Sequence, residues 1–523
     1  MRQVVIPQKG ARGLRAGGDA ESKHLRTDHL LNDLKGRAVR GGVVTASGQA
    51  AKLVLQMGST MVLARLLVPA DFGLIQMVSV CIGFVAMFKD AGLSMATVQR
   101  HEINQAQVST LFWINLGLSI GVMLVTAALA PVLAWFYNEP RLVKITLALA
   151  ASFLFGGLTV QHQALLRRQM RFKALAVIEV LTLIVSILTA ITMAWLGCGY
   201  WSLVGMSIAS SIANCVLVWI FSGWRPGLPV RGCGVRSLLK FGGYLTGFNT
   251  INYLSRNLDN FLVGWWWGPV ALGFYSKAYS LLIQPVRQVN APLSSVMAPT
   301  LSRLHGSNPD GFRTTSLKLF RIMALISSPV AALVAVFSED AVRIVLGGQW
   351  MEAVPIVRWL SVICIIQMIF NQSGNVFTAQ NRADLLFKSG VLNSTAACLS
   401  FLAGLRWGPV GVAAAYTLSG IFVRTPILMY YLAKTGCFKQ RDLYAAVAPI
   451  VCITLGIMAL GIWALPAARL HLGEYVGRLS VLASILAIYA VMYVRWPAYR
   501  AALAEAIALR HDLRRRRAGI SPS

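Results

Sequence analysis

Long apolar stretches alternate with short polar connections along most of the chain. Each stretch is close to the roughly 20 residues that an α-helix needs to cross a bilayer. The pattern predicts about fourteen membrane helices, at 43–67, 72–98, 109–135, 142–165, 174–196, 200–222, 238–265, 268–300, 316–337, 353–378, 384–405, 409–432, 443–465 and 475–494. The seventh and eighth ranges are the most polar of the set.

Lysine and arginine are distributed unevenly over the connections between these predicted helices. Counted together with the adjoining ends of the predicted helices, the even-numbered connections hold eighteen of them and the odd-numbered connections six. Cytoplasmic loops carry the basic excess in membrane proteins, so we expect the even connections and both termini in the cytoplasm. Residues 1–40 are polar and basic without a signal-peptide core, which predicts a disordered cytoplasmic arm, and 498–523 are expected to form a basic cytoplasmic tail.

The composition agrees with an all-α polytopic membrane protein. Hydrophobic residues make up 56% of the 523-residue chain and charged residues 13%, whereas a soluble chain carries roughly a quarter charged residues. The net charge of +29 could suggest nucleic acid. Basic cytoplasmic loops and tails explain it better, and they would contact anionic lipid headgroups. Membrane lipids are therefore expected partners, and nucleic acid is not.

Enzymatic and metal-binding signatures are missing from the sequence. The eight cysteines are dispersed without a CxxC pair, and no two of the seven histidines lie at metal-ligand spacing. The chain has no Walker A loop, HExxH or GxSxG motif. We expect no metal, no cofactor and no catalytic residue, and hence a protein that is not an enzyme.

An internal repeat is the most informative pattern. Residues 49–73, QAAKLVLQMGSTMVLARLLVPADFG, align without a gap with 249–273, NTINYLSRNLDNFLVGWWWGPVALG. Pro69 and Gly73 match Pro269 and Gly273. The polar positions match too and recur on one face of a helix: Gln49, Lys52, Gln56 and Ser59 with Asn249, Asn252, Arg256 and Asp259.

The repeat, with a weaker echo between LGCGYWSLVG and LRWGPVGVAA, predicts two pseudo-symmetric six-helix lobes, 41–222 and 223–435, followed by two additional helices in 436–497. Because each lobe has an even number of spans, the lobes should share one orientation about an axis along the membrane normal.

Charged side chains inside the predicted helices are mostly basic. Lys277, Gln284 and Arg287 add a second polar face on the eighth span. With the two matched stripes they are expected to line a wet, net positive chamber, because charges in membrane helices mostly face a cavity. The stripes could instead only bond the lobes together. Asp90, Asp259 and Glu179, which looks like a lone buried acid, are candidates for ion coupling. Arg65, Lys89, Arg358 and Arg424 lie near span ends, where they could simply snorkel.

Several blocks together resemble polysaccharide flippases of the multidrug/oligosaccharidyl-lipid/polysaccharide exporter superfamily. They are NLDNFLVGWWWGPVALGFYSKAY at 257–279, residues 63–100 with VSTLFWIN at 108–115, and FTAQNRADLLFKSG at 377–390. The likeness covers roughly residues 40–435. It implies a transporter in the bacterial inner membrane that moves a polyprenyl-diphosphate-linked oligosaccharide for exopolysaccharide or lipopolysaccharide biosynthesis, alongside polymerase or export machinery.

The resemblance gives the polar residues specific roles. Arg256 would bind the diphosphate, Asp259 would hold or titrate with it, and Trp265–Trp267 would anchor the outer membrane interface. Alternating access would come from rocking one lobe against the other. A drug/cation antiporter of the same superfamily is the main alternative, but its cavity should favour carboxylates. A glycan polymerase or ligase should show a sizeable outer loop.

Overall fold

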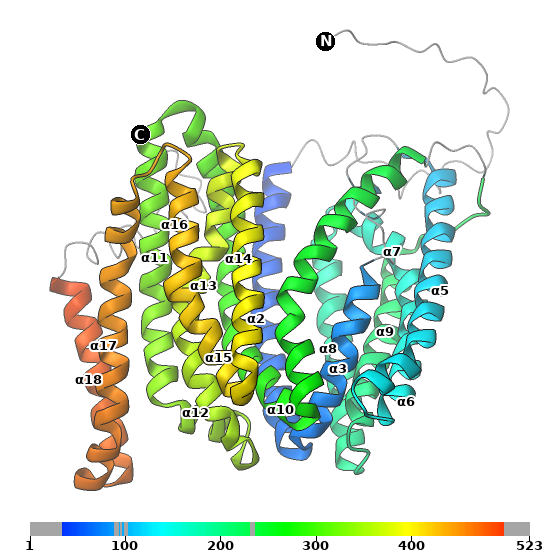
Figure 1. The fold of residues 1–523 in the computed structure, drawn as a ribbon. Coiled ribbons are helices and arrows are strands. Elements are labelled where there is room, and N and C mark those ends of the chain that lie inside the picture. The colour runs from blue at the N-terminus through cyan, green and yellow to red at the C-terminus, as the bar shows by residue number, and fades with distance from the viewer. Residues whose placement is uncertain (1–33, 88–93, 95–96, 99–102, 231–235, 496–523) are drawn as a thin grey trace. The chain divides into compact units, whose positions relative to one another are not determined.

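The computed structural model describes residues 34–87, 94, 97–98, 103–230 and 236–495, without the side chains of 34–47, 236–252, 254–255, 283–293, 295–296 and 494. These residues form helices joined by short turns and contain no strand, so the predicted all-α class is confirmed. The helices (Figure 1) are α2 Leu34–Leu66, α3 Pro69–Ala86, α5 Gln105–Phe136, α6 Arg141–Ala150, α7 Ser152–Arg168, α8 Phe172–Trp195, α9 Trp201–Ser222, α10 Arg236–Ser307, α11 Pro309–Val336, α12 Ser338–Val345, η2 Gly348–Ala353, α13 Val354–Ala379, α14 Ala383–Gly404, η3 Leu405–Trp407, α15 Gly408–Ser419, η4 Gly420–Arg424, α16 Thr425–Ala433, α17 Gln440–Leu472 and α18 Glu474–Arg495.

The predicted spans coincide with helices wherever the structure describes them. Ten helical stretches among the described residues are long and apolar enough to cross a membrane, and one of them, Ala383–Ala433, contains two predicted spans. The polar helices α2 and α10 are outside that group. α10 contains the seventh and eighth spans, which a break at Gly268 (φ 78°) separates. The chain is thus a multi-pass membrane protein, while fourteen crossings remain a prediction.

The helices form two compact units. Unit 1 comprises the described residues of 1–56 and 81–253, and unit 2 those of 57–80 and 254–523. The division falls inside α2, α3 and α10, so the units are connected through helices. The two C-terminal helices belong to unit 2. The lobe boundaries at 222 and 435 that the sequence suggests stay a prediction.

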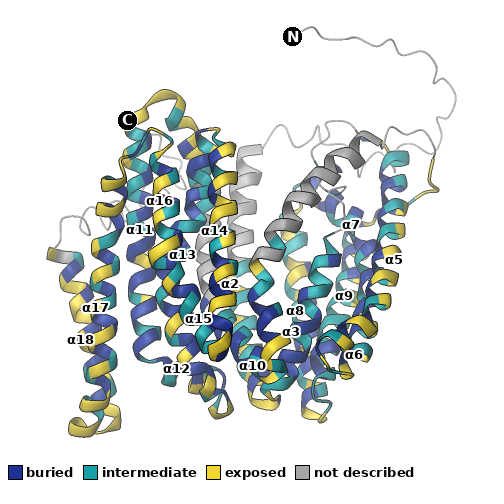
Figure 2. Cartoon of the chain, viewed as in Figure 1, coloured by how far each residue is buried: buried dark blue, intermediate teal, exposed yellow. Residues whose placement is uncertain are grey.

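Unit 1 is built around α5, α7, α8 and α9, in which α7 packs against both α5 and α9, and α8 packs against α9. Phe112 and Leu111 of α5, Leu165 of α7 and Trp224 beyond α9 pack into one buried cluster. Large apolar side chains also remain on the outside, with Trp135 and Trp195 more than 80% exposed. Figure 2 shows this mixture of buried and exposed faces along α5, α7, α8 and α9. Exposed apolar surface on this scale suits contact with lipid rather than with water.

In unit 2, α11 packs between α13 and α17, and α17 packs beside α18 (Figure 1). Ion pairs attach this last hairpin to α12. Arg469 of α17 lies 3.0 Å from Asp340 and 3.4 Å from Glu339, and Arg478 of α18 lies 3.1 Å from Asp340. The two additional helices are therefore fixed to unit 2 by charges as well as by apolar packing.

The two proline–glycine turns of the repeat contact one another within unit 2. A Cβ atom built on Gly73 would overlap the backbone of Pro269, and one built on Gly273 would overlap the backbone of Pro69. This reciprocal approach is what two related copies of one turn produce when they pack together. A second pair of turns is also alike in the two halves of the chain. The residue Met170, before α8, has φ 53°, and the residue Asn381, before α14, has φ 54°.

Candidate functional site

A polar cavity of about 460 Å³ lies inside unit 1. Helices α2, α7, α8 and α9 contribute its walls. The lining residues are Lys52, Ser152, Phe153, Gly156, Thr159, Val160, Gln163, Glu179, Thr182, Leu183, Ser210, Ser211 and Asn214. The volume is within the range of roughly 300–1,000 Å³ that is typical of small-molecule sites.

An ion pair forms one side of this cavity. Lys52 Nζ donates to Glu179 Oε2 at 3.0 Å, and the two side chains are 24% and 47% exposed. Glu179 is therefore neither lone nor buried, and the expectation from the sequence was wrong. The two residues are 127 positions apart, and no local pattern links them. The pair makes the charge of the cavity balanced, and both side chains remain reachable.

The remaining polar lining consists of hydroxyls and amides. Gln163 donates through Nε2 to Asn214 Oδ1 at 3.2 Å. The Ser152 hydroxyl donates to the Leu149 carbonyl of α6 at 2.6 Å, and the hydroxyls of Thr159 and Ser211 donate to carbonyl oxygens of their own helices at 2.7 and 3.0 Å. A hydroxyl that donates to its own backbone still offers its oxygen lone pairs to a ligand. The cavity thus offers acceptors from the helices and donors from Lys52 and the amides.

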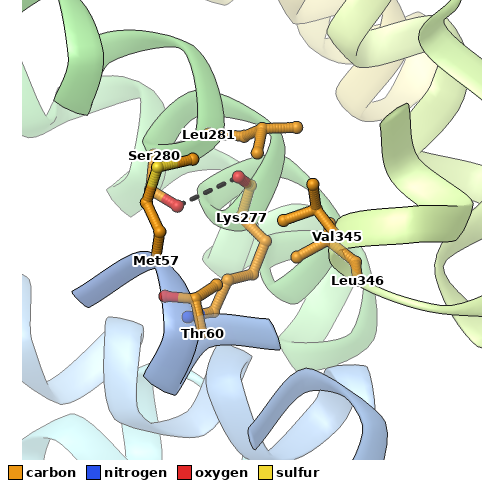
Figure 3. A pocket seen from close by; sticks show the side chains of 7 residues that line it. All are labelled: Met57, Thr60, Lys277, Ser280, Leu281, Val345 and Leu346. Atoms are coloured by element: carbon orange, nitrogen blue, oxygen red, sulfur yellow. Dashed lines mark hydrogen bonds between the residues drawn. The ribbon is translucent and has the colours of Figure 1, made fainter. Parts of the chain in front are cut away.

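Unit 2 contains a second, much smaller pocket beside Lys277. Its volume is about 20 Å³, and Met57, Thr60, Ser280, Leu281, Val345 and Leu346 complete the lining. Figure 3 shows the Lys277 side chain extending toward Thr60. Its ammonium lies 3.9 Å from the centroid of the Phe72 ring, a cation–π contact. Within the described residues no acidic side chain pairs with Lys277, so its positive charge is uncompensated there.

Asp259 is 3% exposed, but its partners differ from the expected one. Its carboxylate accepts from the Tyr275 hydroxyl at 3.0 Å and from the backbone and side-chain nitrogens of Asn260 at 2.8 and 3.2 Å. Arg256 is exposed, and the structure, which describes both side chains, shows no ion pair between them. The expectation that Asp259 holds Arg256 was therefore wrong. The break at Gly268 explains the difference, because it brings α10 back so that Tyr275 reaches Asp259.

The other sequence-predicted site residues fall into two groups. Gln49 and Gln56 of α2 are half-buried in unit 1, on the same helix as Lys52. The side chains of Asn249, Asn252, Gln284 and Arg287, and all of Asp90, lie outside the described residues. Whether the two stripes face one chamber therefore stays a prediction.

The tryptophans before the break, which the sequence predicts to be an interfacial anchor, have exposed rings; the anchor itself stays a prediction. Trp265, Trp266 and Trp267 are all exposed at the turn, and Trp267 Nε1 donates to the Leu405 carbonyl at 2.8 Å. One bond to the protein and an exposed ring suit a side chain at the boundary between lipid and water.

Arg424 is a residue whose burial sequence reasoning missed. It was expected to snorkel, yet it is only 8% exposed. Its guanidinium lies 4.6 Å from the Tyr416 ring and 5.2 Å from the Phe370 ring, and its Nε and Nη1 atoms have no hydrogen-bond partner. It ends the π-helical turn η4, a geometry frequent at functional sites. A charge at the end of an apolar run that begins with glycine, as in GIFVR at 420–424, was the only local signal.

We expect Arg424→Leu to raise the thermal stability of the protein while lowering its transport rate. Burying an incompletely bonded charge costs free energy, so an apolar side chain of similar reach should raise the melting temperature by about 2 °C or more. Thermal unfolding and transport of the purified variant provide the measurement, with Arg406→Leu, at an exposed position, as the control. A lower melting temperature with unchanged transport would show that Arg424 is only structural.

Comparison with known proteins places these features in a family. Lipopolysaccharide biosynthesis protein WzxC of Escherichia coli K12 is 25% identical over 406 residues, covering 76% of this chain and 81% of that protein. Teichuronic acid biosynthesis protein TuaB of Bacillus subtilis 168 is 27% identical over 387 residues, covering 72% and 79%. Among solved structures, the lipid II flippase MurJ in an inward closed conformation has a TM-score of 0.65 at 13% identity, covering 87% of this chain and 99% of that one, which shows a shared fold.

The family described as "Polysaccharide biosynthesis protein" matches residues 62–355, more than half of the chain. The matched range contains both copies of the repeated turn, the Asp259 and Lys277 sites and most of the unit 1 cavity. This chain belongs to the polysaccharide biosynthesis protein family.

Proposed function

We propose that this protein is a flippase that moves polyprenyl-diphosphate-linked oligosaccharides across the bacterial inner membrane by alternating access, for exopolysaccharide or lipopolysaccharide biosynthesis. The observation that carries the proposal is the polar, charge-balanced cavity inside a multi-pass member of the polysaccharide biosynthesis family. The polar groups of such a cavity can form the hydrogen bonds that water otherwise makes to a sugar, whereas the polyprenyl chain can stay in lipid. The WzxC and TuaB names and the fold shared with a lipid II flippase support it.

The charges of the described residues favour an anionic headgroup. Lys277 contributes an ammonium with no acidic partner. Arg256 has an exposed guanidinium that forms no ion pair with a described carboxylate, so it is available to a ligand. A diphosphate is attracted by such groups, and arginine can grip it with two parallel hydrogen bonds. The basic bias of the connections further supports an orientation with both termini in the cytoplasm.

A drug/cation antiporter fits the same residues less well. It would need carboxylates facing its ligand, but Glu179 is neutralised by Lys52 and Asp259 accepts hydrogen bonds in the interior. The one carboxylate that lines the unit 1 cavity, Glu179, is paired with Lys52, and the sequence contains no catalytic motif, so we infer a transporter and not a glycan polymerase or ligase. Such an enzyme, or the export machinery, would be the partner that receives the flipped glycan.

Reconstitution tests the proposed transport directly. Proteoliposomes holding a fluorescent polyprenyl-diphosphate oligosaccharide should expose the inner-leaflet glycan to a membrane-impermeant glycosidase. Lys277→Met should slow this exposure at least tenfold, which corresponds to about 1.4 kcal/mol of lost stabilisation. Lys388→Met removes an exposed lysine from α14 and should leave it unchanged. Transport of cationic drugs without glycan exposure would refute the flippase and favour the antiporter.

A further inference from the structure

The unit 1 cavity contains groups that suit a neutral sugar better than a phosphate or a cation. Its net charge is zero, because Lys52 and Glu179 neutralise one another across 3.0 Å. A phosphate entering it would meet the Glu179 carboxylate and the lone pairs of hydroxyls already donating to backbone. A cation would meet the Lys52 ammonium. For a phosphate or a cation, the attraction to one member of the Lys52–Glu179 pair is therefore offset by the repulsion from the other.

A sugar hydroxyl both donates and accepts one or more hydrogen bonds, and the cavity offers both kinds of partner. Ser152, Thr159 and Ser211 present acceptor oxygens, while Lys52 and the free N–H groups of the Gln163 and Asn214 amides present donors. Val160 and Leu183 supply an apolar wall for the C–H face of a pyranose ring. The cavity volume of about 460 Å³ leaves room for a small ligand rather than for a single water or ion.

We infer that the unit 1 cavity is a carbohydrate subsite that binds uncharged sugar residues of the transported glycan, with the Gln163–Asn214 amide pair and the Lys52–Glu179 ion pair as its polar contacts. This assignment rests on the proposed flippase function. It also changes the role of Lys52, which the sequence placed only among the residues expected to line a net positive chamber. The anionic headgroup is then bound elsewhere, and the two chemical halves of the substrate are recognised by separate groups.

The test uses the full-length protein in nanodiscs and a panel of methyl glycosides of glucose, galactose, mannose and N-acetylglucosamine. Saturation-transfer NMR should detect binding of at least one glycoside, and inorganic diphosphate should not displace it. Gln163→Leu should weaken that binding by about three- to tenfold, the effect of losing one polar contact. Gln367→Leu is the matched control, because Gln367 also donates to an asparagine on a helix, Asn371 at 3.4 Å, but in unit 2. Its glycoside binding should be unchanged.

A second variant distinguishes a loss of binding from a loss of folding. Ser211→Ala removes one acceptor oxygen with little change of volume, and it should weaken the same glycoside while eluting normally in size-exclusion chromatography. The subsite is refuted if no glycoside binds, if diphosphate displaces the glycoside, or if Gln163→Leu and Gln367→Leu weaken binding equally. Flipping of the lipid-linked glycan by the unmodified protein is measured separately. If flipping occurs without glycoside binding, only the subsite fails; if glycosides bind without flipping, the proposed function fails.

Discussion

Replacing Gly73 or Gly273 by alanine should remove most of the folded protein from the membrane. The added methyl group on either residue would overlap the backbone of the matched proline, Pro269 or Pro69. Overpacking by a methyl group ordinarily costs about 1–3 kcal/mol because side chains can move aside. A backbone carbonyl inside a helical turn cannot rotate away, so the two turns must separate and the cost should exceed that range.

Accumulation of a fluorescent fusion, followed by size-exclusion chromatography in detergent, measures this loss. Gly121→Ala is the matched control, because a Cβ atom on this α5 glycine meets no other atom within 4 Å. It should accumulate normally, and a helical Gly→Ala change can even stabilise by about 0.5–1 kcal/mol. Normal amounts of monodisperse Gly73→Ala protein would show that the reciprocal packing of the two turns is unimportant.

The second large effect is expected for Asp259→Leu, which should destabilise unit 2 by about 2–6 kcal/mol. It leaves the buried Tyr275 hydroxyl and the Asn260 amide without their acceptor, at about 1–3 kcal/mol for each buried group. Asp259→Asn keeps an acceptor oxygen and should cost less. Asp259→Leu combined with Tyr275→Phe should recover part of the loss, because both partners are then apolar. Thermal and denaturant unfolding of purified variants provide the measurement.

Arg256→Ala is the control for Asp259, since the exposed arginine makes no ion pair with it. Because the two side chains form no ion pair, their coupling energy in a double-mutant cycle should stay below about 0.5 kcal/mol, the lower limit found for residues that interact. A coupling well above that value would mean that Arg256 and Asp259 do interact. Transport by Asp259→Asn under proton and sodium gradients tests the separate hypothesis of ion coupling. Gradient dependence equal to that of the unmodified protein would leave Asp259 with a structural role alone.

The positions of the helices followed from the sequence because lipid imposes a simple rule. A chain segment in hydrocarbon must satisfy its own backbone hydrogen bonds, so each apolar run of sufficient length becomes a helix. The predicted start at 109 and end at 135, for example, lie within four residues of the observed α5. The repeat was visible too, because only glycine permits two backbones to approach as closely as they do at Gly73 and Gly273.

The choice of partners among polar side chains was decided by the tertiary structure. On the sequence, Arg256 and Asp259 are three residues apart and suggest a pair, yet the turn at Gly268 brings Tyr275 to Asp259 instead. Lys52 finds Glu179 only because α2 packs near α8, which no local pattern encodes. Arg424 is buried because aromatic side chains from two other helical segments surround it.

Apolar length and close backbone packing are properties of a short stretch of chain, so the sequence by itself determined the helices, the membrane class and the repeated turn. A hydrogen bond or an ion pair between distant helices depends on distances of a few ångströms and on side-chain direction. Those quantities exist only once the helices have packed. The charge balance of the unit 1 cavity and the isolation of Lys277 and Arg424 were therefore decided by the tertiary structure alone.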